Sequence, residues 1–130
     1  MTVDERINSD ETRLKNIAQL LPRYAYRMAD EKLFQDGLSE VLNLSGIAHQ
    51  REYVAGPRDR FDFFVDGGIV LEAKVKGSLP AALNQIDRYA AREDVKAVVL
   101  VTTKYWGAAS SVRQLRGKPV YVVKVRGAAF

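Results

Sequence analysis

A chain of 130 residues with 47% apolar and 28% charged residues has the composition of an ordinary soluble globular protein, and its length predicts one domain over residues 1–130. It contains no cysteine and a single histidine, His49, which excludes disulfides, thiol catalysis and the metal centres that depend on these ligands. A bound metal would therefore be a hard cation with oxygen ligands. No apolar run has membrane-helix length and the N-terminal segment is too polar for a signal peptide, so we expect a cytoplasmic protein with no membrane partner.

The net charge of +4 is distributed unevenly along the chain. No acidic residue follows Asp94, whereas seven basic residues do: Lys96, Lys104, Arg113, Arg116, Lys118, Lys124 and Arg126. A segment of one sign indicates a polyanionic partner, most simply nucleic acid. The alternative is a solvated basic face that favours solubility.

Two helices are predicted in the first third of the chain. Apolar residues at helical spacing predict the first over 3–21, ending before Pro22. The second is expected over 30–44, with Asp30 as its N-terminal cap and Gly46 just beyond its end.

Strands alternate with helices in the remainder. The predicted elements are strands over 47–54, 61–65 and 69–76, a helix over 80–92, a buried strand over 95–102, a short helix over 108–115 and a last strand over 119–125. This order predicts an α/β fold with a mixed central sheet and helices on both of its faces.

The strands over 61–65 and 69–76 form a predicted hairpin that contains charged residues. Glu72 and Lys74 are two residues apart and share one face of their strand. A two-residue loop would place Asp62 and Glu72 on opposite faces, whereas a three-residue loop over 66–68 would pair them directly. The glycines of the Asp-Gly-Gly sequence are compatible with the three-residue loop.

Two carboxylates one strand spacing apart repel each other unless a cation lies between them. Mg²⁺ suits Asp62 and Glu72, since it binds one or two carboxylates together with waters and phosphate oxygens. Lys74 would then position or help to deprotonate an attacking water, or stabilise charge on a phosphate. The alternative is a surface ion pair worth about 0–1 kcal/mol.

The string Asp62-(x)9-Glu72-Ala73-Lys74 on a hairpin resembles the PD-(D/E)xK nuclease superfamily. The family's core of helix, three strands, helix and strand matches residues 30–102 in order, which implies a restriction-endonuclease-like fold with an extra N-terminal helix. The resemblance implies that Asp62, Glu72 and the Ala73 carbonyl are metal ligands and that Lys74 is catalytic. Phe61 stands where the family's name has proline.

Further residues match this resemblance. Gln85 and Tyr89 form a Gln-x-x-x-Tyr pair on one helix face, as in RecB-like members; the alternative is an ordinary amphipathic helix. Glu31 opens its helix as the acidic residue of many members does, and fits that position better than Glu40. Its alternative role is favourable charge at a helix N-terminus. Glu52 is interpreted as a solvated edge charge.

Basic residues near these positions are candidates for contact with nucleic acid. Together with Tyr89 they are Arg88, Arg92, Lys76 and Lys104. Arg88 and Arg92 are alternatively expected to pair with Asp87, Glu93 or Asp94. Tyr105 and Trp106 follow Lys104, where an aromatic ring beside a cation can stack on an unpaired base, although a single tryptophan is more often a packing residue.

The sequence therefore predicts a Mg²⁺-dependent deoxyribonuclease, with Mn²⁺ as a substitute and DNA as partner, that is specific for DNA ends or structure rather than for sequence. Alternatives are a Holliday-junction-resolving endonuclease, a catalytically silent nucleic-acid-binding module of the same fold, or an unrelated α/β domain. A homodimer or a subunit of a larger DNA-processing complex is the expected assembly.

Overall fold

A computed structural model describes residues 2–106 and 113–128, with only the backbone described for residues 3–9 and 113. In chain order the elements are α1 (Val3–Leu20), the 3₁₀ turn η1 (Leu21–Arg23), β1 (Ala25–Tyr26), α2 (Glu31–Leu44), β2 (His49–Val54), β3 (Arg60–Val65), β4 (Ile69–Lys74), α3 (Leu79–Ala90), β5 (Ala97–Thr102), β6 (Arg113–Leu115), β7 (Lys118–Lys124) and β8 (Arg126–Gly127). In the part of the chain described, no helix combines the length and the apolar character needed to cross a membrane.

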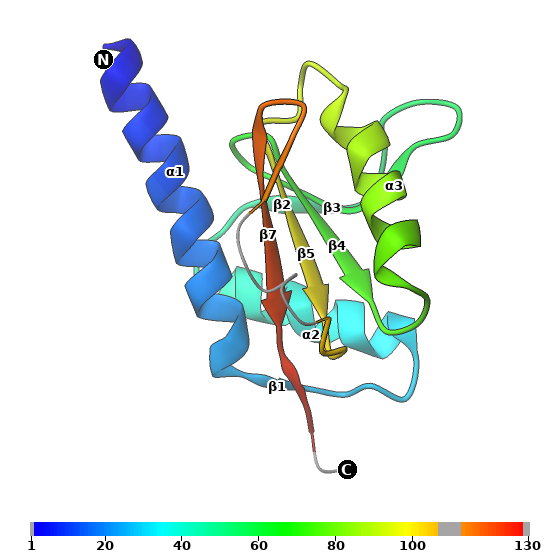
Figure 1. The fold of residues 1–130 in the computed structure, drawn as a ribbon. Coiled ribbons are helices and arrows are strands. Elements are labelled where there is room, and N and C mark those ends of the chain that lie inside the picture. Colours follow the sequence, from blue (N-terminus) through cyan, green and yellow to red (C-terminus); the bar gives the residue numbers. More distant parts are fainter. Residues whose placement is uncertain (1, 107–112, 129–130) are drawn as a thin grey trace.

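Six strands form a mixed sheet in the order β2-β3-β4-β5-β7-β6. The pairs β2–β3, β3–β4 and β6–β7 are antiparallel, whereas β4, β5 and β7 are parallel and end at the same edge of the sheet (Figure 1). The short strands β1 and β8 form a separate parallel pair beyond that edge. The predicted α/β class with a mixed central sheet is confirmed.

Local sequence signals fix where the helices begin. The Asp30 carboxylate accepts a hydrogen bond from the Leu33 N–H at 2.8 Å at the start of α2. Gly46, just beyond the end of α2, has a φ of 71°, a left-handed conformation that glycine adopts more easily than other residues. At α3 the Ser78 hydroxyl accepts from the Ala81 N–H at 3.3 Å. The predicted capping role of Asp30 is therefore confirmed.

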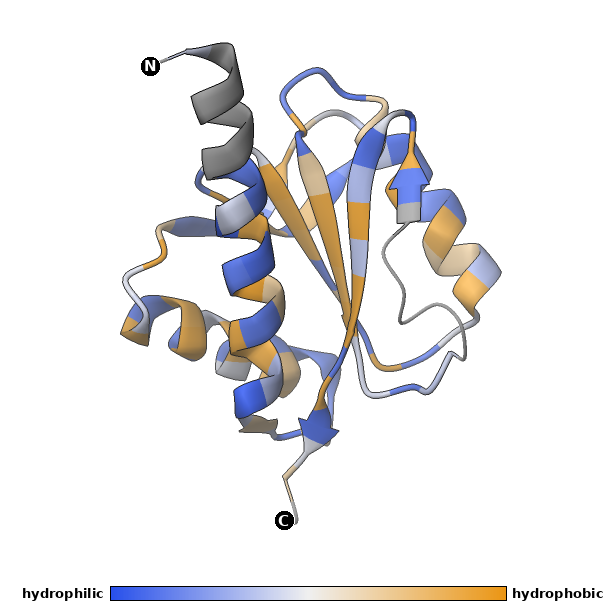
Figure 2. Cartoon of the chain, turned by 60° about the vertical axis from the view of Figure 1, so that its left-hand side comes forward, coloured by the Kyte–Doolittle hydropathy of each residue, from blue (hydrophilic) through white to orange (hydrophobic). Residues whose placement is uncertain are grey.

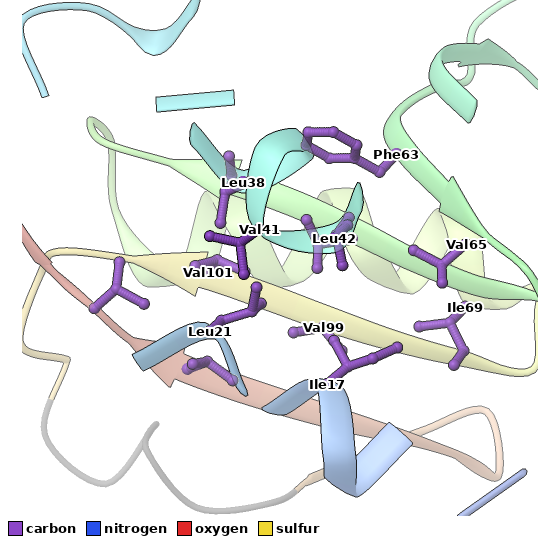
Figure 3. Packing of buried hydrophobic residues seen from close by; sticks show 14 of the residues in the cluster. Ile17, Leu21, Leu38, Val41, Leu42, Phe63, Val65, Ile69, Val99 and Val101 are labelled. Atoms are coloured by element: carbon purple, nitrogen blue, oxygen red, sulfur yellow. The ribbon is translucent and has the colours of Figure 1, made fainter. Parts of the chain in front are cut away.

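Two apolar clusters cover the two faces of the sheet, and apolar residues run along its central strands (Figure 2). The first joins α1 and α2 to one face; in Figure 3 it includes Ile17, Leu21, Leu38, Val41 and Leu42 against Phe63, Val65, Ile69, Val99 and Val101. The second joins α3 to the other face through Phe61, Val70, Ile86, Tyr89, Val98 and Leu100. Every residue of β5 is buried, as expected for a strand covered on both faces.

The C-terminal part differs from the prediction. Residues 108–112 of the expected helix over 108–115 lie outside the described residues, but Arg113–Leu115 form strand β6, so the helical prediction is wrong there. Leu115 pairs with Lys118 across a two-residue loop in which Arg116 and Gly117 both have positive φ, 54° and 74°. Such a loop matches the twist of a hairpin, and this turn decides the local structure.

Candidate active site

The β3–β4 hairpin has the three-residue loop that pairs Asp62 with Glu72. Val65 pairs with Ile69, which leaves residues 66–68 as the loop. Both loop glycines have positive φ, 94° and 80°, a conformation that glycine adopts without steric cost. The same register, continued along the strands, brings Asp62 opposite Glu72. The two carboxylates therefore meet, as the longer loop predicted.

At this point side chains replace the main-chain hydrogen bonds between the strands. The register described for β3 and β4 ends at Phe63 and Leu71. Beyond it, the Asp62 N–H donates to Glu72 Oε1 at 2.9 Å, and the Ala73 N–H donates to Asp62 Oδ2 at 2.8 Å. One oxygen of each carboxylate thus ties β3 to β4, while Asp62 Oδ1 and Glu72 Oε2 take no part in these bonds.

A distortion in β2 faces the same position. The pairs on either side place Glu52 opposite Asp62, and Glu52 has a φ of 53°, rare for a residue with a side chain. Residues two apart in a regular strand point to the same face of the sheet. Phe63 belongs to the first apolar cluster and Phe61 to the second, on opposite faces, so the regular alternation of β3 is interrupted at Asp62. Left-handed backbone of this kind costs of order 1–3 kcal/mol and gathers at functional sites. Sequence reasoning missed it, since no residue type at this position signals positive φ.

Burial sets the electrostatics of the carboxylate pair. It raises the pKa of Asp62 to about 6, and together with the negative charge of Asp62 it raises the pKa of Glu72 to about 8. The charges of Glu31 and Glu52 also raise the pKa of Asp62, whereas Lys74 lowers the pKa of both carboxyls. The site thus disfavours the ionised form of both carboxyls, and a cation beside them would favour that form.

Lys74 lies between two pockets at the ends of the parallel strands. One, of about 470 Å³, lies beside the start of α2 and is lined by Glu31, Lys74 and Lys76 among others. The other, of about 300 Å³, extends along α3 to Gln85 and Arg88 and also includes Lys74 and Lys76. The structure therefore brings the predicted catalytic residues Glu31, Lys74 and Gln85 to one edge of the sheet.

Gln85 and Tyr89 form a directed chain of hydrogen bonds. The Tyr89 hydroxyl donates to the Arg60 carbonyl at 3.0 Å and accepts from Gln85 Nε2 at 3.0 Å. Burial, then the charge of Glu72, raises the pKa of Tyr89 to about 12. Tyr89 is only 1% exposed, so it offers no surface to nucleic acid, in contrast to its predicted contact with DNA. Gln85 Oε1 is buried and has no hydrogen-bond partner in the described part of the chain.

Arg88 and Arg92 share a partner that the sequence did not indicate. Arg88 Nε lies 2.7 Å from Asp59 Oδ1, and Arg92 Nη1 lies 3.1 Å from Asp59 Oδ2. Arg92 also donates to the Ala55 carbonyl, and its Nε lies 3.8 Å from Asp94, one of the partners considered. Both arginines thus fasten α3 to the loop between β2 and β3. Arg88 is half-exposed and faces the Lys74 pocket, where phosphate contact stays a prediction.

The fit to a divalent cation rests on Asp62 and Glu72. Among the described residues, no three acidic, histidine or cysteine side chains gather as a ready-made metal cage. Mg²⁺ does not require one, because it typically binds one or two carboxylates and fills its octahedron with waters and substrate oxygens. The two carboxylate oxygens left over from the strand contacts fit this mode. The N–H bond from Ala73 to Asp62 fixes Ala73 beside the pair, and ligation by the Ala73 carbonyl stays a prediction.

Comparison with protein-family models, with curated proteins and with solved structures finds no match to this chain.

Proposed function

We propose that this protein is a Mg²⁺-dependent deoxyribonuclease of the PD-(D/E)xK type. In this proposal α2, β2, β3, β4, α3 and β5 form its restriction-endonuclease-like core. The observation that carries the proposal is the pairing of half-buried Asp62 with buried Glu72 just beyond the described β3–β4 register, with Lys74 two residues further along β4. A buried and a half-buried carboxylate, beside a lysine that lines two pockets, favour a catalytic arrangement over an incidental ion pair.

The chain's own residues would divide the chemistry among them. Asp62 and Glu72 would hold the metal with the oxygens that are not engaged by main-chain N–H groups, and Mg²⁺ would supply Lewis acidity at the phosphate and a more acidic water. Lys74 positions the attacking water or offsets the charge that grows on the phosphate. Gln85 Oε1 accepts a hydrogen bond from that water, and Glu31 helps to orient it from the opposite pocket.

A catalytically silent DNA-binding module is the second candidate. The observation that favours it is that each carboxylate already accepts a main-chain N–H, so the pair has a structural role without any metal. Within the nuclease proposal, end processing and Holliday-junction resolution by a homodimer differ in the DNA that is cut.

The test is cleavage of labelled single-stranded, blunt duplex, flap and four-way-junction DNA, and of RNA, with Mg²⁺, with Mn²⁺ and with chelator. Asp62→Asn removes the charge yet keeps an oxygen for the Ala73 N–H, so the hairpin is preserved. Glu40→Gln, an exposed change on the outer side of α2, is the matched control.

Metal-dependent cutting by the wild type and by Glu40→Gln, but not by Asp62→Asn, is the expected result. The DNA that is cut fastest then distinguishes end processing from junction resolution. Binding to DNA without cutting under either metal would refute the nuclease and favour the silent module.

A further inference from the structure

A row of residues crosses the sheet where the parallel strands end. Lys74 of β4 is the register partner of Thr102 of β5, and Thr102 is the partner of Lys124 of β7. Side chains in register on neighbouring parallel strands point to the same face. Lys74 faces α3, since Ala73 and Val75 on either side of it pack in the first apolar cluster, on the α2 face of the sheet. Two lysines therefore flank Thr102 on the α3 side of this edge.

After Thr102 the chain continues into a loop, and contacts on either side of Tyr105 hold this loop in place. The Lys104 N–H donates to Thr102 Oγ1 at 3.0 Å, and Trp106 packs against the second apolar cluster, the one beneath α3. The expected packing role of Trp106 is thus confirmed. Between these two fixed points the Tyr105 side chain is 81% exposed. An exposed aromatic ring held by its neighbours presents a flat apolar face to solvent.

The charge around Tyr105 is positive. Arg116 is paired with Asp87 on α3, and Lys118 donates to the Arg92 carbonyl, so these two are engaged elsewhere. Lys104, Lys124 and Arg126 lie at the edge where β5 and β7 end, and no ion pair is described for them within residues 2–106 and 113–128. Since no acidic residue follows Asp94, nothing in this part of the sequence offsets them.

We propose that Tyr105 is a stacking platform for an unpaired base of single-stranded DNA that passes Lys74, with Lys104 and Lys124 at its phosphates. The inference rests on the proposed function for DNA as the ligand, and it names the substrate class: DNA with a single-stranded segment at the cleavage site. Neighbouring strands lie about 4.8 Å apart and three residues span at most about 11 Å, so Tyr105 Cα lies within about 16 Å of Lys74 Cα. That distance corresponds to a few nucleotides of extended strand.

Stacking supplies affinity without sequence preference, because every base has a flat face, while lysines supply the backbone contacts. A continuous duplex cannot use the platform, since its bases are stacked on each other. The difference between single-stranded and duplex DNA is therefore the signature of this surface.

The experiment measures binding to a fluorescent thymidine oligonucleotide of about twelve nucleotides and to a blunt duplex of equal length, in chelator and without cleavage. Tyr105→Ala removes the ring, Tyr105→Phe keeps it, and Tyr24→Ala removes the other exposed tyrosine among the described residues. The single tryptophan, Trp106, adds a second readout, since its emission should change when a base stacks beside it.

We expect Tyr105→Ala to weaken single-strand binding about 5- to 150-fold, the range for loss of one base–aromatic stack, with less than twofold change on duplex. Tyr105→Phe and Tyr24→Ala should bind like the wild type. Equal single-strand affinity of Tyr105→Ala and wild type, or equal losses on both DNAs, would overturn the inference. Because no cleavage is involved, Tyr105-dependent binding by a protein that cuts nothing would uphold the platform and refute only the nuclease.

Discussion

Replacing Glu72 by glutamine should stabilise the fold, and increasingly so as the pH rises. In the folded protein burial and the charge of Asp62 raise the pKa of Glu72 from 4.5 to about 8. Below pH 4.5 the carboxyl is protonated in both states and affects stability little. As the pH rises through this window the unfolded chain loses the proton that the folded chain retains, so the free energy of unfolding falls.

The size of the effect follows from the same window. Each pH unit between 4.5 and about 8 is worth about 1.4 kcal/mol, which gives an upper limit near 5 kcal/mol. Glutamine keeps an oxygen for the Asp62 N–H but does not reproduce every contact of the carboxyl. We therefore expect Glu72→Gln to be about 2–4 kcal/mol more stable than the wild type at pH 8 and nearly equal to it at pH 4.

Urea denaturation in chelator from pH 4 to pH 9 measures this difference, with Glu40→Gln as the exposed control. The urea dependence should be unchanged, so that the shift in midpoint reports stability alone. The reasoning that burial raises the pKa of Glu72 and so destabilises the fold at high pH would be refuted if Glu72→Gln had the same pH profile of stability as the wild type, or were less stable than it at pH 8.

Three further predictions follow from neighbouring contacts. At pH 8, Mg²⁺ at tenfold excess over its Kd should stabilise the wild type by about 1.4 kcal/mol, roughly 5 °C in a thermal melt, and should not stabilise Asp62→Asn. Equal stabilisation of the two proteins would show that Mg²⁺ does not bind at this site. Tyr89→Phe leaves the Arg60 carbonyl without its donor and should cost about 1–3 kcal/mol in urea, whereas a change below about 0.5 kcal/mol would show that the hydroxyl contributes little. Asp59→Asn weakens the anchoring of α3 by Arg88 and Arg92 and should cost about 1 kcal/mol at low salt and less in 1 M NaCl; a loss independent of salt would contradict an electrostatic anchor.

Features set by local sequence were predictable. Asp30 caps α2 because a short carboxylate reaches the N–H three residues on, and the two loop glycines supply the positive φ of a three-residue hairpin loop. That loop determines which residues face each other, so the meeting of Asp62 and Glu72 followed once its length was fixed.

Features that depend on distant partners were not predictable. Asp59 lies 29 and 33 positions from the two arginines it binds, and nothing in its neighbourhood distinguishes it from Asp87 or Asp94. The positive φ of Glu52 occurs opposite Asp62, where the alternation of β3 changes, and residue type does not reveal such a change. Near the C-terminus the sequence predicted a helix over 108–115, whereas the turn at Arg116 and Gly117 produces a hairpin. Arginine seldom adopts positive φ, so the sequence did not indicate this turn.

The most direct test of the nuclease is the initial rate of DNA cleavage by Lys74→Ala and by Lys96→Ala, each measured with Mg²⁺ and with chelator beside the wild type. Lys74 lines two pockets and lies two residues from Glu72, whereas Lys96 lies at the opposite end of β5. The account predicts Mg²⁺-dependent cutting by the wild type and by Lys96→Ala, and a loss of at least about 100-fold in Lys74→Ala, the lower range for removing a positioned catalytic group. Cutting by Lys74→Ala at the wild-type rate, or no cutting by any of the three proteins on any DNA, would contradict it.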